Sequence, residues 1–219
     1  MRQLVTPSPL PGRPPRRPQV ELIEATTSVV AGAFFESFRL LALNTRRAIA
    51  GEPRRVIVVI SAHPGDGRSL CSASLAQALS ALMPPVVLVD ADPLGAGLSD
   101  LRLYSAQAFD AITRSTTSVQ FDEPVPPLQV FQPAHRLDHA ALIEEVESAV
   151  STSVAEQATV IIDSPPCTIS SLGFHLASIA TGVIYVARRR AQDGAIHREI
   201  RGQLNRLGTR IIGVVFNEG

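Results

Sequence analysis

The 219-residue sequence contains no tryptophan and no lysine, and all 20 of its basic residues are arginine, which is typical of coding bias in a GC-rich genome. The 20 acidic residues balance them, and a net charge of zero gives no support for a role on nucleic acid. Cys71 and Cys167 are too few for a disulfide framework, so we expect two reduced thiols in a cytoplasmic protein. Apolar runs such as Val56–Ile60 are too short to cross a bilayer, and the first 19 residues contain no hydrophobic signal core.

The N-terminal region differs in composition from the rest of the chain. Residues 1–19 hold six prolines and four arginines, and we predict a disordered tail over residues 1–28 followed by one domain over residues 29–219. Apolar residues then recur at helical spacing from Phe34, which predicts an amphipathic helix over about 34–50. Gly51 and Pro53 end it.

Short apolar segments and helical segments alternate through the remaining chain. The strand-like segments are β-branched and lack internal alternation, which is typical of strands buried on both faces of a parallel sheet. The sequence therefore predicts an α/β fold with three layers, in which helices flank a mostly parallel central sheet. The predicted strands cover 55–61, 86–90, 128–131, 159–163, 182–187 and 210–216, and the predicted helices cover part of 98–114 together with 69–83, 139–156 and 191–207.

A glycine-containing loop lies between the first of these strands and the following helix. Its sequence, SAHPGDGRSL over residues 61–70, fits the phosphate-binding pattern G/A-x-x-x-x-G-K-[ST] from Ala62 to Ser69, except that Arg68 replaces the lysine. Glycines at 65 and 67 allow a tight backbone that turns amide groups onto phosphate oxygens, and the helix N-terminus favours the same anion. The predicted nucleotide-contacting residues of the loop are His63, Pro64, Gly65, Asp66, Gly67, Arg68, Ser69 and Leu70.

Aspartates follow two other predicted strands. Asp90 ends the segment VVLVD and Asp92 lies two residues further on, while Asp163 ends TVIID. Ligands of open α/β sheets bind at the carboxyl ends of the strands, so we expect these carboxylates near the loop. A single aspartate at a strand end is commonplace. The glycine loop and the two strand ends with aspartates, in this order along the chain, together predict a nucleotide site.

These motifs together resemble the bacterial tyrosine kinases (BY-kinases) of capsule and exopolysaccharide synthesis, which are P-loop proteins related to partition and division-site ATPases. The resemblance covers about residues 30–217. ESFRLLALNTR is similar to the E-x-x-R-x-x-R helix that packs protomers of the family into a ring, and PGDGRS to its P-G-x-G-K-S loop. VDADP, IIDSPP and GVVFN are similar to its second Walker element, its Walker B strand and its closing strand.

The resemblance implies a P-loop NTPase fold, ATP and Mg²⁺ as cofactors, and protein-tyrosine kinase activity. Ser69 and Asp90 would hold Mg²⁺, with Asp163 acting on it through a water molecule. Arg68 would contact the phosphates and Asp92 would activate the incoming tyrosine hydroxyl, while Asn217 would contact adenine.

The resemblance also implies partners and a location. The expected partner is a membrane polysaccharide co-polymerase that regulates chain length, and the expected location is cytoplasmic, at the inner face of the membrane. Glu36 and Arg39 would join copies of the chain into a homo-oligomer.

Several positions depart from the family pattern. Arginine is planar and fork-shaped, so Arg68 is not equivalent to a lysine that acts as a compact charge. Three further residues differ from the family pattern. Leu94 replaces an arginine, Ala42 replaces the last arginine of the ring motif, and Leu172 replaces an aspartate. The only tyrosines are Tyr104 and Tyr185, and no tyrosine-rich segment follows the last predicted strand. The sequence therefore leaves open an active kinase, a catalytically impaired pseudokinase that acts as a scaffold in the same machinery, and a partition-type ATPase.

Overall fold

The computed structural model describes residues 24–93, 98, 129–133, 139–188 and 194–217, with side chains from residue 36 onward except that of His139. Its centre is a parallel sheet with the strand order β3-β2-β4-β1-β5-β6. This arrangement confirms the predicted parallel α/β sheet. The strands are β1 (Val56–Ser61), β2 (Val86–Asp90), β3 (Gln129–Phe131), β4 (Thr159–Asp163), β5 (Gly182–Arg188) and β6 (Ile211–Asn217).

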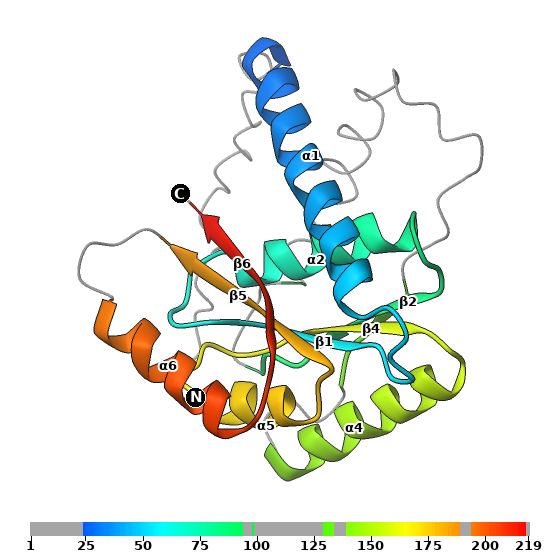
Figure 1. Ribbon diagram of the computed structural model, residues 1–219, viewed down its shortest axis with the longest axis vertical. Helices are drawn as coiled ribbons and strands as arrows, with labels where there is room; N and C mark the ends of the chain where they lie inside the picture. Colours follow the sequence, from blue (N-terminus) through cyan, green and yellow to red (C-terminus); the bar gives the residue numbers. More distant parts are fainter. Residues whose placement is uncertain (1–23, 94–97, 99–128, 134–138, 189–193, 218–219) are drawn as a thin grey trace, which may run out of the picture.

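Helices cover both faces of the sheet and complete three layers (Figure 1). Helices α1 (Glu24–Ala48) and α2 (Arg68–Ser80) pack on one face, where side chains such as Leu75 and Ile161 form one buried cluster. Helices α4 (His139–Ala155), α5 (Leu172–Ser178) and α6 (Gly194–Arg206) pack on the other face, around a second cluster that includes Val146 and Leu204. The inner strands β1, β2 and β4 are buried along their whole length, which explains why their sequences do not alternate.

Two elements differ from the sequence-based expectation. Helix α1 begins at Glu24, so it includes residues 24–28 that we assigned to the tail. The β-branched residues and the glycine between Glu24 and Ala33 have low helix propensity, and they concealed this first part of the helix. Helix α5 was not predicted, because its seven residues are too few to show a helical period.

The sheet register brings the predicted motifs to one edge. Val59 in β1 and Asp90 in β2 are both register partners of Asp163 in the intervening strand β4. The amide of Ala91 donates a hydrogen bond to the carbonyl of Asp163 (2.9 Å) and extends this alignment beyond the strands. The loop after β1 and the carboxylates after β2 and β4 therefore share the carboxyl edge of the sheet.

Other sequence-based expectations lie outside the described residues. The tail over residues 1–23 and most of the helix expected within 98–114 belong to this group, as do Leu94 and Tyr104. Among the helices that are described, none combines the length and the hydropathy needed to cross a bilayer.

Candidate nucleotide site

The loop between β1 and α2 has the backbone that the sequence predicts. Gly65 (φ 75°) and Gly67 (φ 90°) occupy the left-handed region, which other residues rarely adopt. The Asp66 carboxylate accepts a hydrogen bond from the His63 amide (2.8 Å), which closes the turn between them. The loop is therefore held by its own side chain and backbone groups.

The first turn of α2 opens directly from this loop. Gly67 is the N-cap residue and has no side chain to bond the amide groups of the first turn, and the first hydrogen bond of the helix joins the Cys71 amide to the Gly67 carbonyl (2.9 Å). Amide groups at a helix N-terminus attract anions, and a phosphate group is the anion that this loop geometry suits.

Asn217, the last residue of β6, contacts the loop. Its side-chain amide donates a hydrogen bond to the Asp66 carbonyl (3.1 Å). A Cβ atom added to Gly67 would lie 2.4 Å from the Asn217 side-chain nitrogen, so glycine is required at 67 for space as well as for conformation. The end of the last strand and the loop over residues 61–70 are therefore in direct contact.

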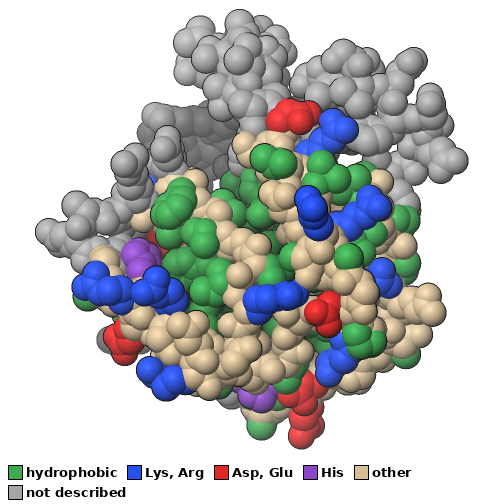
Figure 2. All heavy atoms as spheres, in the orientation of Figure 1, with side chains coloured by type: hydrophobic (Ala, Val, Ile, Leu, Met, Phe, Trp, Pro, Cys, Tyr) green, Lys and Arg blue, Asp and Glu red, His purple; other side chains and the backbone are tan. Residues whose placement is uncertain are grey.

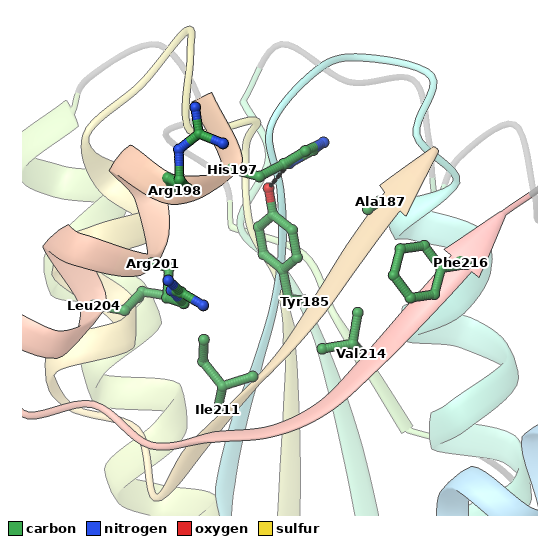
Figure 3. Close-up of a pocket in the computed structure, with 9 residues that line it drawn as sticks. All are labelled: Tyr185, Ala187, His197, Arg198, Arg201, Leu204, Ile211, Val214 and Phe216. Atoms are coloured by element: carbon green, nitrogen blue, oxygen red, sulfur yellow. Dashed lines mark hydrogen bonds between the residues drawn. The ribbon is translucent and has the colours of Figure 1, made fainter. Parts of the chain in front are cut away.

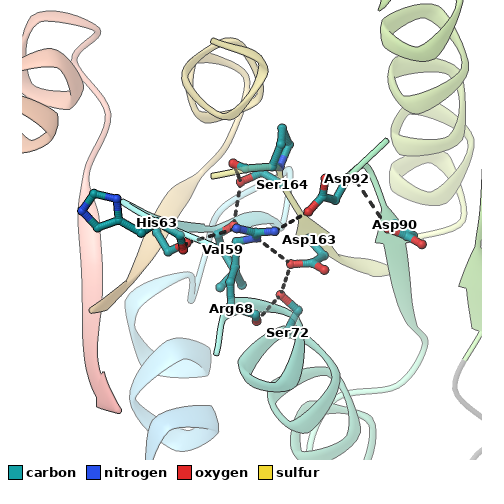
Figure 4. A network of polar contacts seen from close by, with 10 residues as sticks. Val59, His63, Arg68, Ser72, Asp90, Asp92, Asp163 and Ser164 are labelled. Carbon is teal, nitrogen blue, oxygen red and sulfur yellow. Dashed lines mark hydrogen bonds and ion pairs between the residues drawn. The ribbon is translucent and has the colours of Figure 1, made fainter. Parts of the chain in front are cut away.

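Arg68 is buried and its guanidinium points toward the aspartates (Figure 4). It donates hydrogen bonds from Nη2 to Asp92 Oδ2 (2.5 Å), from Nε to Asp163 Oδ1 (3.2 Å) and from Nη1 to Ser61 Oγ (3.1 Å). The side chains of both aspartates are less than a tenth exposed, so these are buried ion pairs. Arg68 therefore neutralises the carboxylates that the sequence assigns to metal binding and to catalysis.

Asp163 is the most deeply buried of the three carboxylates. Burial raises its pKa from 3.8 to about 6 and the Asp90 charge acts in the same direction, while Arg68 and the hydroxyls of Ser69 and Ser72 lower it. Ser72 donates a hydrogen bond to Asp163 Oδ1 (3.0 Å), whereas Oδ2 is buried without a hydrogen-bond partner among the described residues. A buried carboxylate oxygen of this kind favours a further donor or a cation next to it.

Asp90 and Asp92 complete the acidic edge. The Asp92 amide donates to Asp90 Oδ1 (3.4 Å), and Gln132, which follows β3, donates to Asp90 Oδ2 (3.3 Å). Both carboxylates are buried. The oxygens of Ser69, Asp90 and Asp163 are of the type that Mg²⁺ prefers. Among the described residues no cluster of three or more His, Cys, Asp or Glu could hold a metal ion alone, and Mg²⁺ sites of nucleotide-binding proteins indeed take part of their ligands from the phosphates.

The remaining predicted residues lie around this centre or apart from it. The His63 ring points away from the three carboxylates (Figure 4), and Pro64, Gly65 and Leu70 are exposed at the loop surface. Glu36 and Arg39 form an exposed ion pair (3.5 Å) within α1, the helix that precedes β1 and the loop in the sequence. Their role in joining copies stays a prediction.

Sequence reasoning missed two side chains of the network. Ser61 and Ser72 each bond a charged member, Arg68 and Asp163 respectively. Ser72 lies four residues after Arg68 and therefore on the same face of α2, which is a signal that the sequence does contain. Ser61 carries no such signal, because it follows an apolar strand and resembles an ordinary strand end.

The fold resembles that of several solved structures, although the sequence itself matches no known family. No model of a known protein family and no curated protein matches the sequence. Among solved structures, the kinase domain of the Escherichia coli tyrosine kinase ETK superposes with a TM-score of 0.62 at 17% identity, over 84% of this chain and 74% of that chain. The VpsO kinase domain gives 0.63 at 20% identity over 90% and 98%, and the BceF tyrosine kinase domain gives 0.56 at 22% over 84% and 76%. The chain therefore has the three-layer α/β P-loop fold of bacterial tyrosine kinase domains.

Proposed function

We propose that the chain binds Mg-ATP at the loop over residues 61–70 and acts as a divergent protein-tyrosine kinase. The observation that carries the proposal is the meeting of a left-handed glycine loop, an open helix N-terminus and three aspartates at one sheet edge. Each part alone is common, whereas their combination would supply the amide groups, the metal ligands and the general base that phosphoryl transfer uses.

We assign a role to each residue of the site from its position in the structure. The amide groups from Gly65 to Ser69 would bind the phosphates, and Asn217, whose side chain bonds the Asp66 carbonyl, would contact the adenine. Ser69 and Asp90 would hold Mg²⁺, with the unpartnered oxygen of Asp163 accepting from a metal-bound water. The metal would supply charge neutralisation on the phosphate oxygens. Asp92 would accept the proton of the tyrosine hydroxyl.

Arg68 controls whether this chemistry can proceed. In its buried position it pairs with Asp92 and Asp163, so it must leave both carboxylates before it can contact a phosphate and before Asp92 can accept a proton. Breaking a buried ion pair without a substitute costs about 3–5 kcal/mol. We therefore expect slow phosphoryl transfer that depends strongly on Mg²⁺, whose charge can replace that of the guanidinium.

The second candidate is a pseudokinase that acts as a scaffold. The three hydrogen bonds that hold Arg68 inside the acidic edge favour it, because they stabilise a state without phosphate in the loop. A partition-type ATPase remains the third candidate, and the helix α1 ahead of the loop strand makes it the weakest. In either of the first two roles we propose a cytoplasmic location and a membrane co-polymerase of polysaccharide synthesis as partner, on the resemblance of the motifs.

A phosphoryl-transfer assay with labelled ATP and a tyrosine copolymer tests the proposal. We expect slow transfer by the wild type, a rate at least about tenfold higher for Arg68→Lys, and no transfer by Asp90→Ala. A tenfold change corresponds to about 1.4 kcal/mol, which is well below the cost of breaking the buried pairs. If the wild type and Arg68→Lys are both inactive although both bind Mg-ATP, the pseudokinase is the better description.

A further inference from the structure

Gln132 brings a side-chain amide to the acidic edge of the candidate site. It directly follows β3 and is half-buried. Its Nε2 donates a hydrogen bond to Asp90 Oδ2 (3.3 Å), while Asp90 itself is only 2% exposed. The contact joins residues 42 positions apart, so no local motif of the sequence indicates it.

The sheet register explains why these two side chains meet. Strands β2 and β3 run in parallel with Val89 beside Phe131, so the residues that follow, Asp90 and Gln132, come to lie next to each other. Asp90 is in turn the register partner of Asp163 in β4. The amide and the two carboxylates therefore form a row at the carboxyl ends of β3, β2 and β4.

Gln132 and Arg68 hold different carboxylates of this edge by different means. Arg68 pairs with Asp92 and Asp163, and its charge neutralises theirs. Gln132 is an uncharged donor, which fixes the direction of the Asp90 carboxylate without neutralising it. The backbone amide of Asp92 donates to the other oxygen, Asp90 Oδ1 (3.4 Å). Each oxygen of Asp90 therefore accepts a hydrogen bond from an uncharged group.

We propose that Gln132 is a positioning residue for the metal, and that by holding the Asp90 carboxylate in one orientation it makes the site prefer Mg²⁺ over Ca²⁺. The inference rests on the proposed function, in which Asp90 is a ligand of Mg²⁺. Mg²⁺ requires short bonds in near-ideal octahedral geometry, whereas Ca²⁺ takes more oxygens, one or both of them from a carboxylate, in flexible geometry. A carboxylate that is fixed at both oxygens suits Mg²⁺, and one that can turn suits Ca²⁺.

The surroundings of Gln132 allow its replacement without damage to the core. Its side chain lines a hollow of about 770 Å³ between β3 and α4, and it belongs to neither of the two buried hydrophobic clusters. Removal of its amide therefore opens no cavity in either cluster. Gln132→Met keeps about the length of the side chain and lacks the donor, and Gln132→Ala removes the side chain. Both variants are expected to fold.

A polar contact beside β6 provides a matched control. On the face that Figure 2 shows, arginine and histidine side chains lie over α6, next to hydrophobic side chains over β6. In a pocket of about 300 Å³ between these elements, the Tyr185 hydroxyl and His197 Nδ1 are hydrogen-bonded (2.5 Å; Figure 3). The described lining of this pocket includes neither the loop over 61–70 nor the three aspartates. His197→Ala therefore removes a side-chain hydrogen bond outside the site.

Titration calorimetry of the full chain with ATP tests the proposal when it is done with Mg²⁺, with Ca²⁺ and with both ions chelated. We expect the wild type to bind ATP more tightly with Mg²⁺ than with Ca²⁺. Gln132→Ala and Gln132→Met should each weaken binding with Mg²⁺ by about tenfold, because groups that hold a ligating carboxylate contribute this much to metal affinity. Their affinity for ATP without a metal should not change. Gln129→Ala, on the same strand, and His197→Ala should keep the wild-type preference.

A double variant shows whether Gln132 acts through Asp90. Adding Gln132→Ala to Asp90→Ala should change ATP binding with Mg²⁺ no further, and a further loss overturns the proposal. Circular dichroism establishes that each variant is folded.

The other outcomes separate this proposal from the proposed function. A wild type that binds Mg-ATP without preference over Ca²⁺ overturns the proposal alone. So does an unchanged preference in both Gln132 variants, or an equal loss with and without metal, which is the result of a merely structural role. A wild type that binds no ATP with either ion overturns the proposed function and this inference together.

Discussion

Arg68 and lysine would differ at this position in shape as well as in basicity. The planar guanidinium reaches Ser61, Asp92 and Asp163 at once, which the compact ammonium group of a lysine could not do in the same geometry. The side chain at position 68 therefore determines the charge balance of the buried acids in the state without nucleotide. It converts a loop cation into a counter-ion of the buried acids.

The stability of the protein should reflect this role of Arg68. We predict that Arg68→Ala lowers the free energy of unfolding by about 3–5 kcal/mol, because it leaves two buried carboxylates without their cation. Arg68→Lys should cost less. The matched control is Arg39→Ala, which removes an exposed ion pair to Glu36 and should change stability by about 0.5 kcal/mol or less. Urea denaturation measures all three, and equal effects at positions 68 and 39 would contradict the buried role.

Asp163 should make the stability depend on pH. Its pKa is about 6 in the folded protein, above the ordinary 3.8, so the folded state binds the proton more tightly than the unfolded chain does. The contribution of this group is therefore fully present below pH 3.8 and is lost as the pH rises through about 6. We predict that the stability of the wild type relative to Asp163→Asn falls across this window. Denaturation of both proteins at a series of pH values checks it, and a difference that is flat or that rises with pH would contradict it.

At the scale of elements, the contact between β6 and the loop over residues 61–70 is the most specific feature. Gly67 has both a left-handed φ and the Asn217 side chain against it, whereas Gly65 has a left-handed φ with nothing within 4 Å of the position of a Cβ atom. The two glycines therefore separate the cost of conformation from the cost of space.

We predict that Gly65→Ala lowers stability by about 1–3 kcal/mol through backbone strain alone, and that Gly67→Ala costs more because its methyl group displaces Asn217. Adding Asn217→Ala to Gly67→Ala should recover part of the loss, whereas adding it to Gly65→Ala should not. Thermal or urea denaturation of this double-mutant cycle measures the coupling. Additive effects in both pairs would show that Asn217 does not restrict position 67.

The sequence predicted elements better than it predicted contacts. The inner strands β1, β2 and β4 were recognised because they are β-branched and fully buried, and the positions of all six predicted strands agree closely with those observed. Helix α5 lacked the length to show a period, and the first turns of α1 lacked strong helix formers. The pairing of Arg68 with Asp92 and Asp163 joins residues 24 and 95 positions apart, so it depends on the sheet register and on the rotamer of one arginine. A local sequence pattern indicates neither the sheet register nor the rotamer of the arginine.

At the scale of the whole molecule, the sheet order explains how the residues of the candidate site come together. Placing β4 between β1 and β2 brings the loop and the aspartates together at the carboxyl edge. Among the described strands β3 and β6 lie at the outside of the sheet.

The central claim is that Mg-ATP binds in the loop while Mg²⁺ takes over the charge balance that Arg68 provides to the buried aspartates. Titration calorimetry of the wild type with ATP, once with Mg²⁺ and once with the metal chelated, tests it most directly, with Asp90→Ala as the matched variant. We predict micromolar binding in the presence of Mg²⁺, at least about tenfold weaker binding without it, and loss of the Mg²⁺ effect in Asp90→Ala. The absence of binding in both conditions, or equal binding in both, would contradict the account.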